Sequence, residues 1–365
     1  MTIGDRGADV IFSLIARGRS LHASDIHVEP DQGAALRVYT QIQRAADTSV
    51  SVAAVAAFLD LTLDRVNRAR LDRLGVADAV YADETVGAIR IHATRGRAGF
   101  RLAIRLLARS IPELGSLGLP AIVPSFCELQ SGLILVAGPT GSGKSTTIAS
   151  LLDRINATSA RHIVTFEDPI EYHHRWLRSV VTQYEVGRDV GSFAEGIRGA
   201  MRADPDVLFV GELRGLDTVA AALQAAETGH LVFAAVHTPS ESAQTINRIV
   251  GLFPADEQQS ARIRLADALR AMIGLRLMPL LDRTGLRAAV EVALASDAVR
   301  RLIRDGATHQ LRTTIAAARR EGSQTLESHL SELVAAGDID LQTARAASQY
   351  PDDVREPISG TVRRR

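Results

Sequence analysis

The sequence predicts an α/β protein in which a small N-terminal domain precedes a larger domain built on a parallel sheet. Between residues 132 and 237 four apolar runs alternate with helical segments, and these runs are GLILVAG, HIVTFED, DVLFVGE and HLVFAAVH. Apolar runs without polar alternation are typical of strands that are covered on both faces, and hence of a parallel sheet. Before residue 108, shorter strands of alternating polarity mix with helices, which indicates a separate α/β domain.

The elements of the first domain follow from the spacing of its apolar residues. Residues 9–18 carry apolar side chains at helical spacing, and a longer helical stretch is predicted from about 52 to 74. SDIHVEP, residues 24–30, alternates between polar and apolar residues and ends at a proline, as a strand does. Residues 88–106, AIRIHATRGRAGFRLAIRL, alternate in two halves around a glycine-containing turn and predict a β-hairpin.

Prolines and glycines set the predicted domain boundaries. SIPELGSLGLP carries both residue types at close spacing, which is typical of a linker. We therefore expect an N-terminal domain at 1–108, a linker at 109–120 and a second domain at 121–350. Within the second domain, the segment from about 258 to 350 is expected to be mostly helical. The last residues, 351–365, have the composition of a disordered tail.

Composition limits the classes of function. The chain has 365 residues and equal numbers of basic and acidic residues, 42 of each, so its net charge does not favour a nucleic-acid partner. Its single cysteine, Cys127, excludes an intramolecular disulfide and a multi-cysteine zinc site. No apolar stretch reaches the ~18–20 residues that span a bilayer, and the N-terminus does not resemble a signal peptide. We expect a soluble, cytoplasmic protein that binds neither nucleic acid nor zinc.

The segment after the first apolar run matches the phosphate-binding loop of nucleoside triphosphatases. GPTGSGKS, residues 138–145, satisfies G-x-x-x-x-G-K-[ST] between a predicted strand and a predicted helix. In such a loop the glycines let backbone N–H groups turn towards phosphate oxygens, the lysine adds a positive charge and the serine hydroxyl binds Mg²⁺. The sequence therefore predicts ATP binding, and the candidate residues are Gly138, Pro139, Thr140, Gly141, Ser142, Gly143, Lys144, Ser145 and Thr146.

Reactive side chains follow the three other predicted strands. Glu167 and Asp168 end one strand, Glu212 ends the next and His237 ends the last. Because ligands bind beyond the carboxyl ends of strands in an open parallel sheet, we expect these side chains near the phosphates. Acids at strand ends are also common helix caps, so the inference rests on all of them together. His237 is the candidate contact for the γ-phosphate.

The position before Glu212, where such strands often carry an aspartate, is occupied by Gly211. Mg²⁺ needs only one or two carboxylates besides phosphate oxygens and water, so Ser145 with Glu167 or Asp168 is a sufficient candidate set. Glu212 is then free to orient or deprotonate the attacking water. We expect Gly211 to let the backbone approach the γ-phosphate closely.

Several arginines have no evident partner in the local sequence. A capping-box sequence at 192–195 opens a predicted helix on which Arg198 and Arg202 lie one turn apart. Arg101 and Arg105 share one face of the second hairpin strand, since their spacing is even. Such arginines are either solvated surface residues, or residues that reach a nucleotide held by a neighbouring subunit and neutralise charge in the transition state. The sequence leaves both interpretations open.

Taken together, these motifs resemble the secretion ATPase superfamily of type II secretion and type IV pili, and are most similar to its pilus-retraction (PilT-type) members. GPTGSGKSTT resembles the phosphate loop of that family, TFEDPIEYHH its aspartate box, MRADPDVLFVGELR its Walker B segment and AAETGHLVFAAVHT its histidine box. The likeness covers nearly the whole chain and is densest from 132 to 255.

The resemblance implies an N-terminal PAS-like α/β domain, a RecA-like ATPase domain with a helical C-terminal region, and a homohexameric ring that uses ATP and Mg²⁺. It also implies that the partner is a platform protein of the inner membrane, which places the ring at the cytoplasmic face of that membrane. By motif position it implies roles in hydrolysis for six residues: Glu212 in catalysis, Glu167 beside the metal and the water, His237 near the γ-phosphate, and Arg105 together with Arg198 or Arg202 across subunits.

Two features favour pilus retraction over pilus assembly. Assembly and secretion members commonly carry a four-cysteine insert, which one cysteine cannot build. AVRRLIRDG, residues 298–306, resembles the C-terminal A-I-R-N-L-I-R-E signature of the retraction group, with departures at Val299, Arg301 and Asp305. One alternative is the same engine in a type II or type IV secretion apparatus or in pilus assembly. Another is a non-hydrolysing accessory subunit that binds ATP, to which only Gly215 points, because the family usually has an aspartate there.

Overall fold

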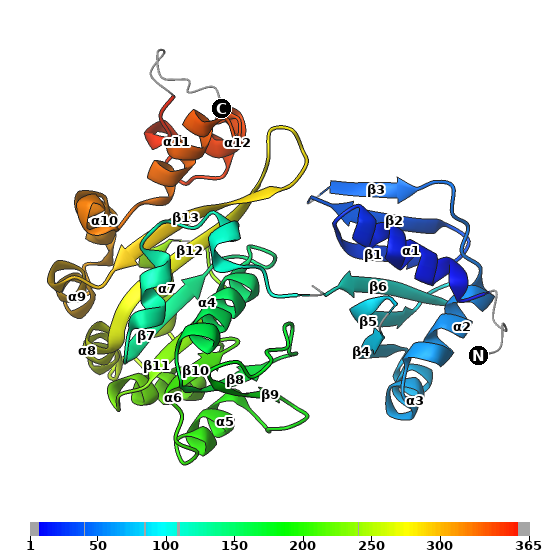
Figure 1. Ribbon diagram of the computed structural model, residues 1–365, viewed down its shortest axis with the longest axis horizontal. Helices are drawn as coiled ribbons and strands as arrows, with labels where there is room; N and C mark the ends of the chain where they lie inside the picture. Colours follow the sequence, from blue (N-terminus) through cyan, green and yellow to red (C-terminus); the bar gives the residue numbers. More distant parts are fainter. Residues whose placement is uncertain (1–6, 40, 84, 108–109, 240, 357–365) are drawn as a thin grey trace. The chain divides into compact units, whose positions relative to one another are not determined.

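The computed structural model describes residues 7–39, 41–83, 85–107, 110–239 and 241–356 (Figure 1). The chain forms two compact units, Met1–Ser110 and Ile111–Arg365, and each unit has its own sheet and its own hydrophobic core. None of the helices in the described part of the chain is long and apolar enough to cross a membrane.

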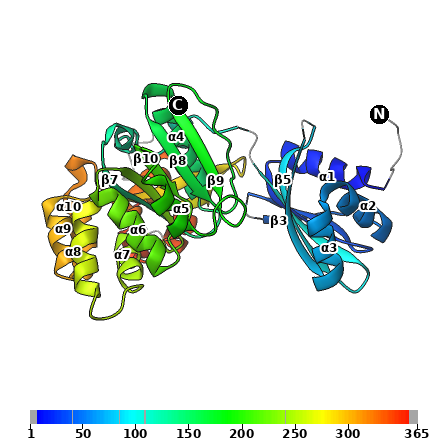
Figure 2. The ribbon, with the colours of Figure 1, turned by 90° about the horizontal axis from the view of Figure 1, so that it is seen from below.

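Within the described residues, the first unit is a six-stranded antiparallel sheet with three helices. The strand order is β3-β2-β1-β6-β5-β4. The strands are β1 (Ala23–Glu29), β2 (Gly33–Val38), β3 (Gln41–Ala45), β4 (Val76–Asp83), β5 (Gly87–Arg95) and β6 (Phe100–Leu106). Helices α1 (Asp9–Ser20), α2 (Val52–Thr62) and α3 (Arg65–Leu74) lie on one face of the sheet and share one core with it (Figure 2). The predicted strand at 24–30 and hairpin at 88–106 are confirmed by β1 and by the antiparallel pair β5 and β6.

The helical stretch predicted from 52 to 74 is two helices rather than one. The side chain of Ser51 accepts the N–H of Ala54 and caps α2, and the side chain of Asp64 accepts the N–H of Asn67 and caps α3. A side chain that satisfies the free N–H groups of a first turn favours a new helix start at that point. The spacing of apolar residues continues across such a start and does not reveal it.

The second unit is built on a seven-stranded sheet with the order β13-β12-β7-β11-β10-β8-β9. The four predicted strands are present and parallel, as β7 (Gly132–Ala137), β8 (His162–Glu167), β10 (Val207–Val210) and β11 (Leu231–Val236). β9 (Val180–Glu185) adds a parallel strand at one edge. One face is covered by α5 (Phe193–Ala200), α6 (Leu216–Glu227), α7 (Ser242–Val250) and α8 (Gln258–Ala268), and the other face by α4 (Lys144–Thr158) with η1 (Leu114–Leu117) and η2 (Val123–Glu128).

The expectation that 258–350 is mostly helical is wrong for two long strands. β12 (Leu269–Pro279) pairs in parallel with β7, and β13 (Leu286–Leu294) pairs antiparallel with β12. The sequence of β12, LRAMIGLRLMP, is rich in residues that also favour helices, so local propensity is ambiguous there. The pairing with β7 selects the strand over the helix, because β12 then provides hydrogen-bond partners for the backbone groups at the edge of β7, which is distant in sequence. Helices follow β13, namely α9 (Asp297–Arg304), α10 (Leu311–Ala317), α11 (Leu326–Ala336) and α12 (Leu341–Ala346).

The expectation of a disordered tail from residue 351 is wrong for 351–356. Pro351–Asp353 form a short 3-10 turn, and the side chain of Val354 is fully buried in a small core with α11 and α12. Burial of one such side chain stabilises the packed state by about 1.5–3 kcal/mol, which a disordered segment would forgo. Residues 357–365 of the expected tail lie outside the described residues.

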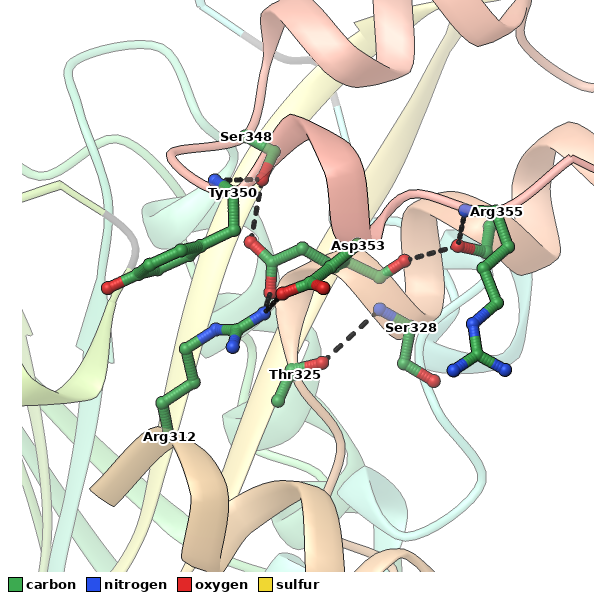
Figure 3. A network of polar contacts seen from close by, with 9 residues as sticks. Arg312, Thr325, Ser328, Ser348, Tyr350, Asp353 and Arg355 are labelled. Carbon is green, nitrogen blue, oxygen red and sulfur yellow. Dashed lines mark hydrogen bonds and ion pairs between the residues drawn. The ribbon is translucent and has the colours of Figure 1, made fainter. Parts of the chain in front are cut away.

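A polar network fastens this last segment to α10 and α11 (Figure 3). The guanidinium of Arg312 lies 4.0 Å from the centroid of the Tyr350 ring and donates to the carboxylates of Asp353 and Glu327. Glu327, which is 3% exposed, also accepts a hydrogen bond from Ser348 Oγ at 2.7 Å. Buried charges remain in the folded state only where they are paired in this way.

Candidate functional site

The predicted phosphate loop lies between β7 and α4, at the carboxyl edge of the parallel sheet. β7 runs directly into the loop, and α4 begins at Lys144. Gly138, Gly141 and Gly143 have φ angles of 156°, 76° and 93°, in the region that favours glycine. A Cβ on Gly138 would lie 2.5 Å from the carbonyl oxygen of Leu275 on β12, so the close approach of β12 to the phosphate loop also requires a glycine at this position.

The ammonium group of Lys144 lies inside this loop. Its Nζ donates to the carbonyl oxygens of Gly138 and Pro139, each at 2.8 Å, and lies 3.4 Å from Nδ1 of His237. Burial lowers the pKa of Lys144 to about 8, although nearby carboxylates oppose the change. An ammonium group held by carbonyl oxygens can exchange them for phosphate oxygens, which are stronger acceptors.

Two hydroxyl groups of the loop fit a phosphate and its metal, and a third contacts a tyrosine. Within the described residues, the buried Oγ of Ser142 has no hydrogen-bond partner, which is rare for a buried hydroxyl and fits a site that a phosphate oxygen completes. Ser145 lies in the first turn of α4, where the helix N-terminus favours anions. Thr146 Oγ1 lies 2.8 Å from the hydroxyl of Tyr172, which follows β8.

Glu212 and His237 approach this lysine from the ends of β10 and β11. Oε2 of Glu212 lies 3.7 Å from Nε2 of His237, and the other ring nitrogen faces Lys144. Burial and the charge of Lys144 lower the pKa of His237, which favours its neutral ring. Oε1 of Glu212 lies 2.7 Å from Nε of Arg214, whose side chain is 71% exposed. The three predicted residues Lys144, His237 and Glu212 are therefore brought into one contiguous group.

Glu167 and Asp168 lie at the end of β8, at the same edge of the sheet. Oε1 of Glu167 accepts hydrogen bonds from Thr165 Oγ1 at 2.7 Å and from Gln183 Nε2 at 3.1 Å. Burial raises the pKa of Glu167 to about 7, and both donors act against that rise. Asp168 is exposed. The two carboxylates therefore differ, since one is buried and held in place and the other faces solvent.

The donor set fits Mg²⁺ held jointly by protein and phosphate. Among the residues that the structure describes, no cluster of three or more His, Cys, Asp or Glu side chains could hold a metal. Mg²⁺ is commonly bound by one or two carboxylates together with phosphate oxygens and water, so such a cluster is not required. Ser145, Glu167 and Asp168 supply hard oxygen donors at the edge of the sheet that carries the phosphate loop.

The backbone shows why a glycine precedes Glu212. The N–H of Gly211 donates to the carbonyl oxygen of Phe166 on β8 at 2.8 Å. A Cβ at this position would lie 3.0 Å from that oxygen and 3.3 Å from Cα of Glu167. The reason that the structure gives for Gly211 is thus the approach of β8, whereas the sequence suggested an approach to the γ-phosphate.

The two hairpin arginines have partners on β1 within the first unit. Nε of Arg105 lies 3.0 Å from Oδ1 of Asp25, and Nε of Arg101 lies 2.5 Å from Oε2 of Glu29. Both arginine side chains remain about half exposed, at 49% for Arg101 and 48% for Arg105. Exposed ion pairs of this kind contribute about 0–1 kcal/mol, so either arginine can change partner at little cost.

The predicted cap at Ser192 is present at the start of α5, and the two arginines that follow it are exposed. Ser192 accepts the N–H of Glu195 and caps α5, as expected. Arg198 lies near the end of α5, whereas Arg202 lies beyond the helix, which ends at Ala200. Both side chains are exposed, and neither has an ion pair within the described part of the chain. These two arginines are therefore accessible to an external anion.

Comparison with known proteins identifies the family. Residues 10–364 match the family model described as type II/IV secretion system protein. This chain belongs to that family. The type IV pilus retraction ATPase PilT of Pseudomonas aeruginosa is 35% identical over 343 residues, which are 94% of this chain and 99% of the relative. A twitching motility protein of Neisseria gonorrhoeae is 39% identical over 269 residues, which are 74% of this chain and 72% of the relative.

Solved structures give the same result. The crystal structure of the pilus retraction motor PilT with bound ADP matches with a TM-score of 0.82 and 40% identity, over 94% of this chain and 98% of that chain. The ATPase DotB of Legionella pneumophila matches with a TM-score of 0.83 and 26% identity, over 95% and 97%. The similarity to PilT-type ATPases, the PAS-like and RecA-like α/β fold class, the ATPase assignment and the binding of a nucleotide are thereby confirmed.

Some residues of the site were not among those predicted from the sequence. Arg214 forms an ion pair with Glu212, and the motif GELRG contains both residues, with the arginine two positions after the acid and just beyond a buried strand. Gln183 contacts Glu167 from β9, a strand that was not predicted, so nothing in the sequence could have brought the two together. Tyr172 lies inside TFEDPIEYHH, but its contact with the phosphate loop depends on the tertiary fold.

Proposed function

We propose that this chain hydrolyses Mg²⁺-bound ATP as a subunit of a homohexameric ring that retracts a type IV pilus. The observation that carries the proposal is the convergence of Lys144, Glu212 and His237 at the carboxyl edge of one parallel sheet. Similarity to a pilus retraction ATPase over 94% of the chain supports retraction as the task. In this proposal the ring works in the cytoplasm against a platform protein of the inner membrane, without nucleic acid or zinc.

The phosphate loop holds the triphosphate in this proposal. Backbone N–H groups of 138–146 surround the phosphate oxygens, and Lys144 exchanges its carbonyl partners for the outer phosphates. Ser145, Glu167 and Asp168 are the residues that hold Mg²⁺. When bound, this ion neutralises the charge that develops on the phosphoryl group.

Glu212 orients and deprotonates the water that attacks the γ-phosphate. Its side chain is 15% exposed, one carboxylate oxygen is held by Arg214, and the other faces His237. The neutral ring of His237 can donate one N–H to the γ-phosphate, because a neutral imidazole has one donor and one acceptor nitrogen. His237 thus acts as the contact that distinguishes ATP from ADP.

Arginines supplied by a neighbouring subunit complete the site in this proposal. Arg105, Arg198 and Arg202 are the candidates, because all three are exposed and the ion pair that Arg105 forms within the described residues leaves its side chain 48% exposed. Such arginines stabilise the charge of the transition state. Turnover then moves domain 1–108 relative to domain 121–350 about the linker at 109–120.

Steady-state ATPase assays of the purified protein with Mg²⁺ test the enzymatic part. Lys144→Ala is expected to abolish turnover, because the outer phosphates lose their only lysine contact in the loop. Glu212→Gln is expected to bind ATP and to hydrolyse it at least about 100-fold more slowly, since it loses the general base. A hexameric wild-type protein without Mg²⁺-dependent turnover would falsify hydrolysis and favour a non-hydrolysing accessory subunit.

Mixing two inactive variants tests the role of Arg105 across subunits. If Arg105 serves the nucleotide of a neighbour, rings that mix Arg105→Ala with Glu212→Gln contain some sites with both residues intact, and activity exceeds that of either pure ring. If Arg105 serves its own nucleotide, no mixed site has both residues and activity stays at the level of the pure variants. The same mixing experiment applies to Arg198 and Arg202.

A type II or type IV secretion apparatus is the second candidate, and the description of the matching family, type II/IV secretion system protein, supports it. Deleting the gene and counting surface pili separates the two. Retained or excess pili with loss of twitching support retraction. Loss of pili, or loss of secreted proteins with pili unchanged, supports assembly or secretion instead.

A further inference from the structure

Glu291 is a buried carboxylate that the proposed mechanism does not use. It lies in β13 and is 4% exposed. In the sheet it pairs with Gly274 of β12, which pairs with Ala137, the last residue of β7 before the phosphate loop. Ala137 in turn pairs with Val236, the last residue of β11 before His237. Glu291 therefore belongs to a row of paired residues across four strands, and on β7 and β11 that row immediately precedes the phosphate loop and His237.

The carboxylate of Glu291 caps a helix from another element of the fold. Its Oε1 accepts the backbone N–H of Ser242 at 2.7 Å and the hydroxyl of Ser242 at 2.6 Å. Ser242 is the first residue of α7, and the N-cap residue Glu241 provides no side-chain cap of its own. The first N–H groups of a helix lack partners within the helix, and a carboxylate near them is also favoured by the helix dipole. The start of α7 is thus fixed by β13.

The start of α7 is tied in turn to His237. The N–H of Thr238 donates to the carbonyl oxygen of Val236 at 3.1 Å, so the chain turns tightly at His237. The buried Oγ1 of Thr238 lies 3.0 Å from Oγ1 of Thr245 in α7. A displacement of α7 therefore displaces Thr238, and with it the ring that faces Lys144 and Glu212.

We propose that Glu291 is a positioning residue of the ATPase, which sets the place of His237 by fixing the start of α7 and thereby sets the preference for ATP over ADP. Glu291 touches no substrate and acts through Ser242 and α7. The inference rests on the proposed function, since it takes His237 as the contact for the γ-phosphate.

The ratio of two binding constants tests this role without requiring turnover. The full-length protein is titrated calorimetrically with ADP and with a non-hydrolysable ATP analogue, both with Mg²⁺. Glu291→Ala is expected to reduce the preference for the triphosphate by about fivefold or more. This is the effect of losing one hydrogen bond, here the one between His237 and the γ-phosphate. His237→Ala is expected to give the same loss, and the double variant no further loss. Glu291→Gln is expected to retain most of the preference, because its amide oxygen can still accept both bonds from Ser242.

Two further variants separate positioning from stability. His329 accepts the N–H of Val290, the neighbour of Glu291 on the same strand, at 2.9 Å and is 7% exposed. His329→Ala is therefore expected to lower the melting temperature but to keep the nucleotide preference. Ser242→Pro removes both donors to Glu291 at a helix position that tolerates proline, and is expected to reproduce the loss seen in Glu291→Ala. This variant serves as the test if Glu291→Ala does not fold.

The outcomes are distinct. An unchanged preference in folded Glu291→Ala or in folded Ser242→Pro overturns the inference. An equal loss of preference in His329→Ala also overturns it, because the effect is then one of general stability. A wild-type protein that prefers the triphosphate but does not hydrolyse ATP overturns the proposed function, and the loss of that preference in the two variants still supports the role of Glu291.

Discussion

The hydroxyl of Tyr172 lies 2.8 Å from Oγ1 of Thr146 and joins the segment after β8 to the first turn of α4. Tyr172→Phe removes this hydrogen bond and leaves the ring. Because one such bond contributes about 1 kcal/mol, we expect the affinity for ATP to fall about fivefold. Calorimetric titration with a non-hydrolysable analogue measures the change.

The matched control for Tyr172 is Tyr184 on β9. Its ring stacks on Phe166, with centroids 5.6 Å apart, and its hydroxyl has no hydrogen bond within the described part of the chain. Tyr184→Phe is therefore expected to leave the affinity unchanged. Equal affinities in the wild type and both variants would show that the contact with Thr146 has no role in binding.

Gly211→Ala is expected to destabilise the second unit. The new Cβ would lie 3.0 Å from the carbonyl oxygen of Phe166, and backbone atoms at this distance must shift to accommodate it. Overpacking of this kind costs about 1–3 kcal/mol, which urea unfolding can measure. Gly199, near the end of α5, has open space around a Cβ, so Gly199→Ala should be neutral or slightly stabilising. Equal stability of the two variants would contradict the explanation given for Gly211.

His329 is expected to make the protein less stable in weak acid. Burial lowers the pKa of His329 from 6.5 to about 4, and a proton at Nδ1 would also displace the N–H of Val290. The unfolded chain therefore binds more protons than the folded chain between these pKa values, and stability is lost as the pH falls from 6.5 towards 4.

His329→Ala isolates this contribution. Between pH 7 and pH 5 the stability gap between the wild type and the variant is expected to narrow by about 2 kcal/mol, because only the wild type gains a proton on unfolding. Urea unfolding at both pH values measures the gap. A gap that stays constant or widens in acid contradicts the buried, neutral state of the ring.

Removing residues 350–365 is expected to lower stability by about 3–5 kcal/mol. The truncation exposes the cavity that Val354 fills and removes the Tyr350 and Asp353 partners of Arg312 (Figure 3). Thermal unfolding followed by circular dichroism measures the loss. A shorter truncation of 357–365 keeps all of the residues that form the contacts described above and serves as the control. If both truncated proteins have the same melting temperature, the packing of 350–356 contributes little to stability.

Much of the fold could be predicted because its signals are local. The four apolar runs became the parallel strands β7, β8, β10 and β11, and alternating residues became the β5 and β6 hairpin. β12 and β13 could not be predicted in the same way, since their residues also suit helices and only pairing with β7 selects strands. The break between α2 and α3 depends on one capping residue, Asp64, inside a continuous apolar pattern.

For the candidate site, too, local features could be predicted from the sequence and long-range contacts could not. Residues within a motif, such as Lys144 and Glu212, could be found from spacing, because a strand end fixes which edge of the sheet they reach. Contacts between motifs could not. The partner of Arg105 on β1 and the cap that Glu291 provides to α7 join segments that are distant in sequence, and no periodicity relates them.

The position of β12 beside the phosphate-loop strand has a practical consequence for protein production. A shortened version that stops near residue 258 would expose one whole side of β7, a ribbon of leucine, isoleucine and valine whose peptide groups could then recruit the same ribbon from other molecules. We expect a fragment that ends near residue 258 to aggregate and to accumulate as inclusion bodies. We expect a soluble nucleotide-binding fragment to extend at least through Leu294, the end of β13.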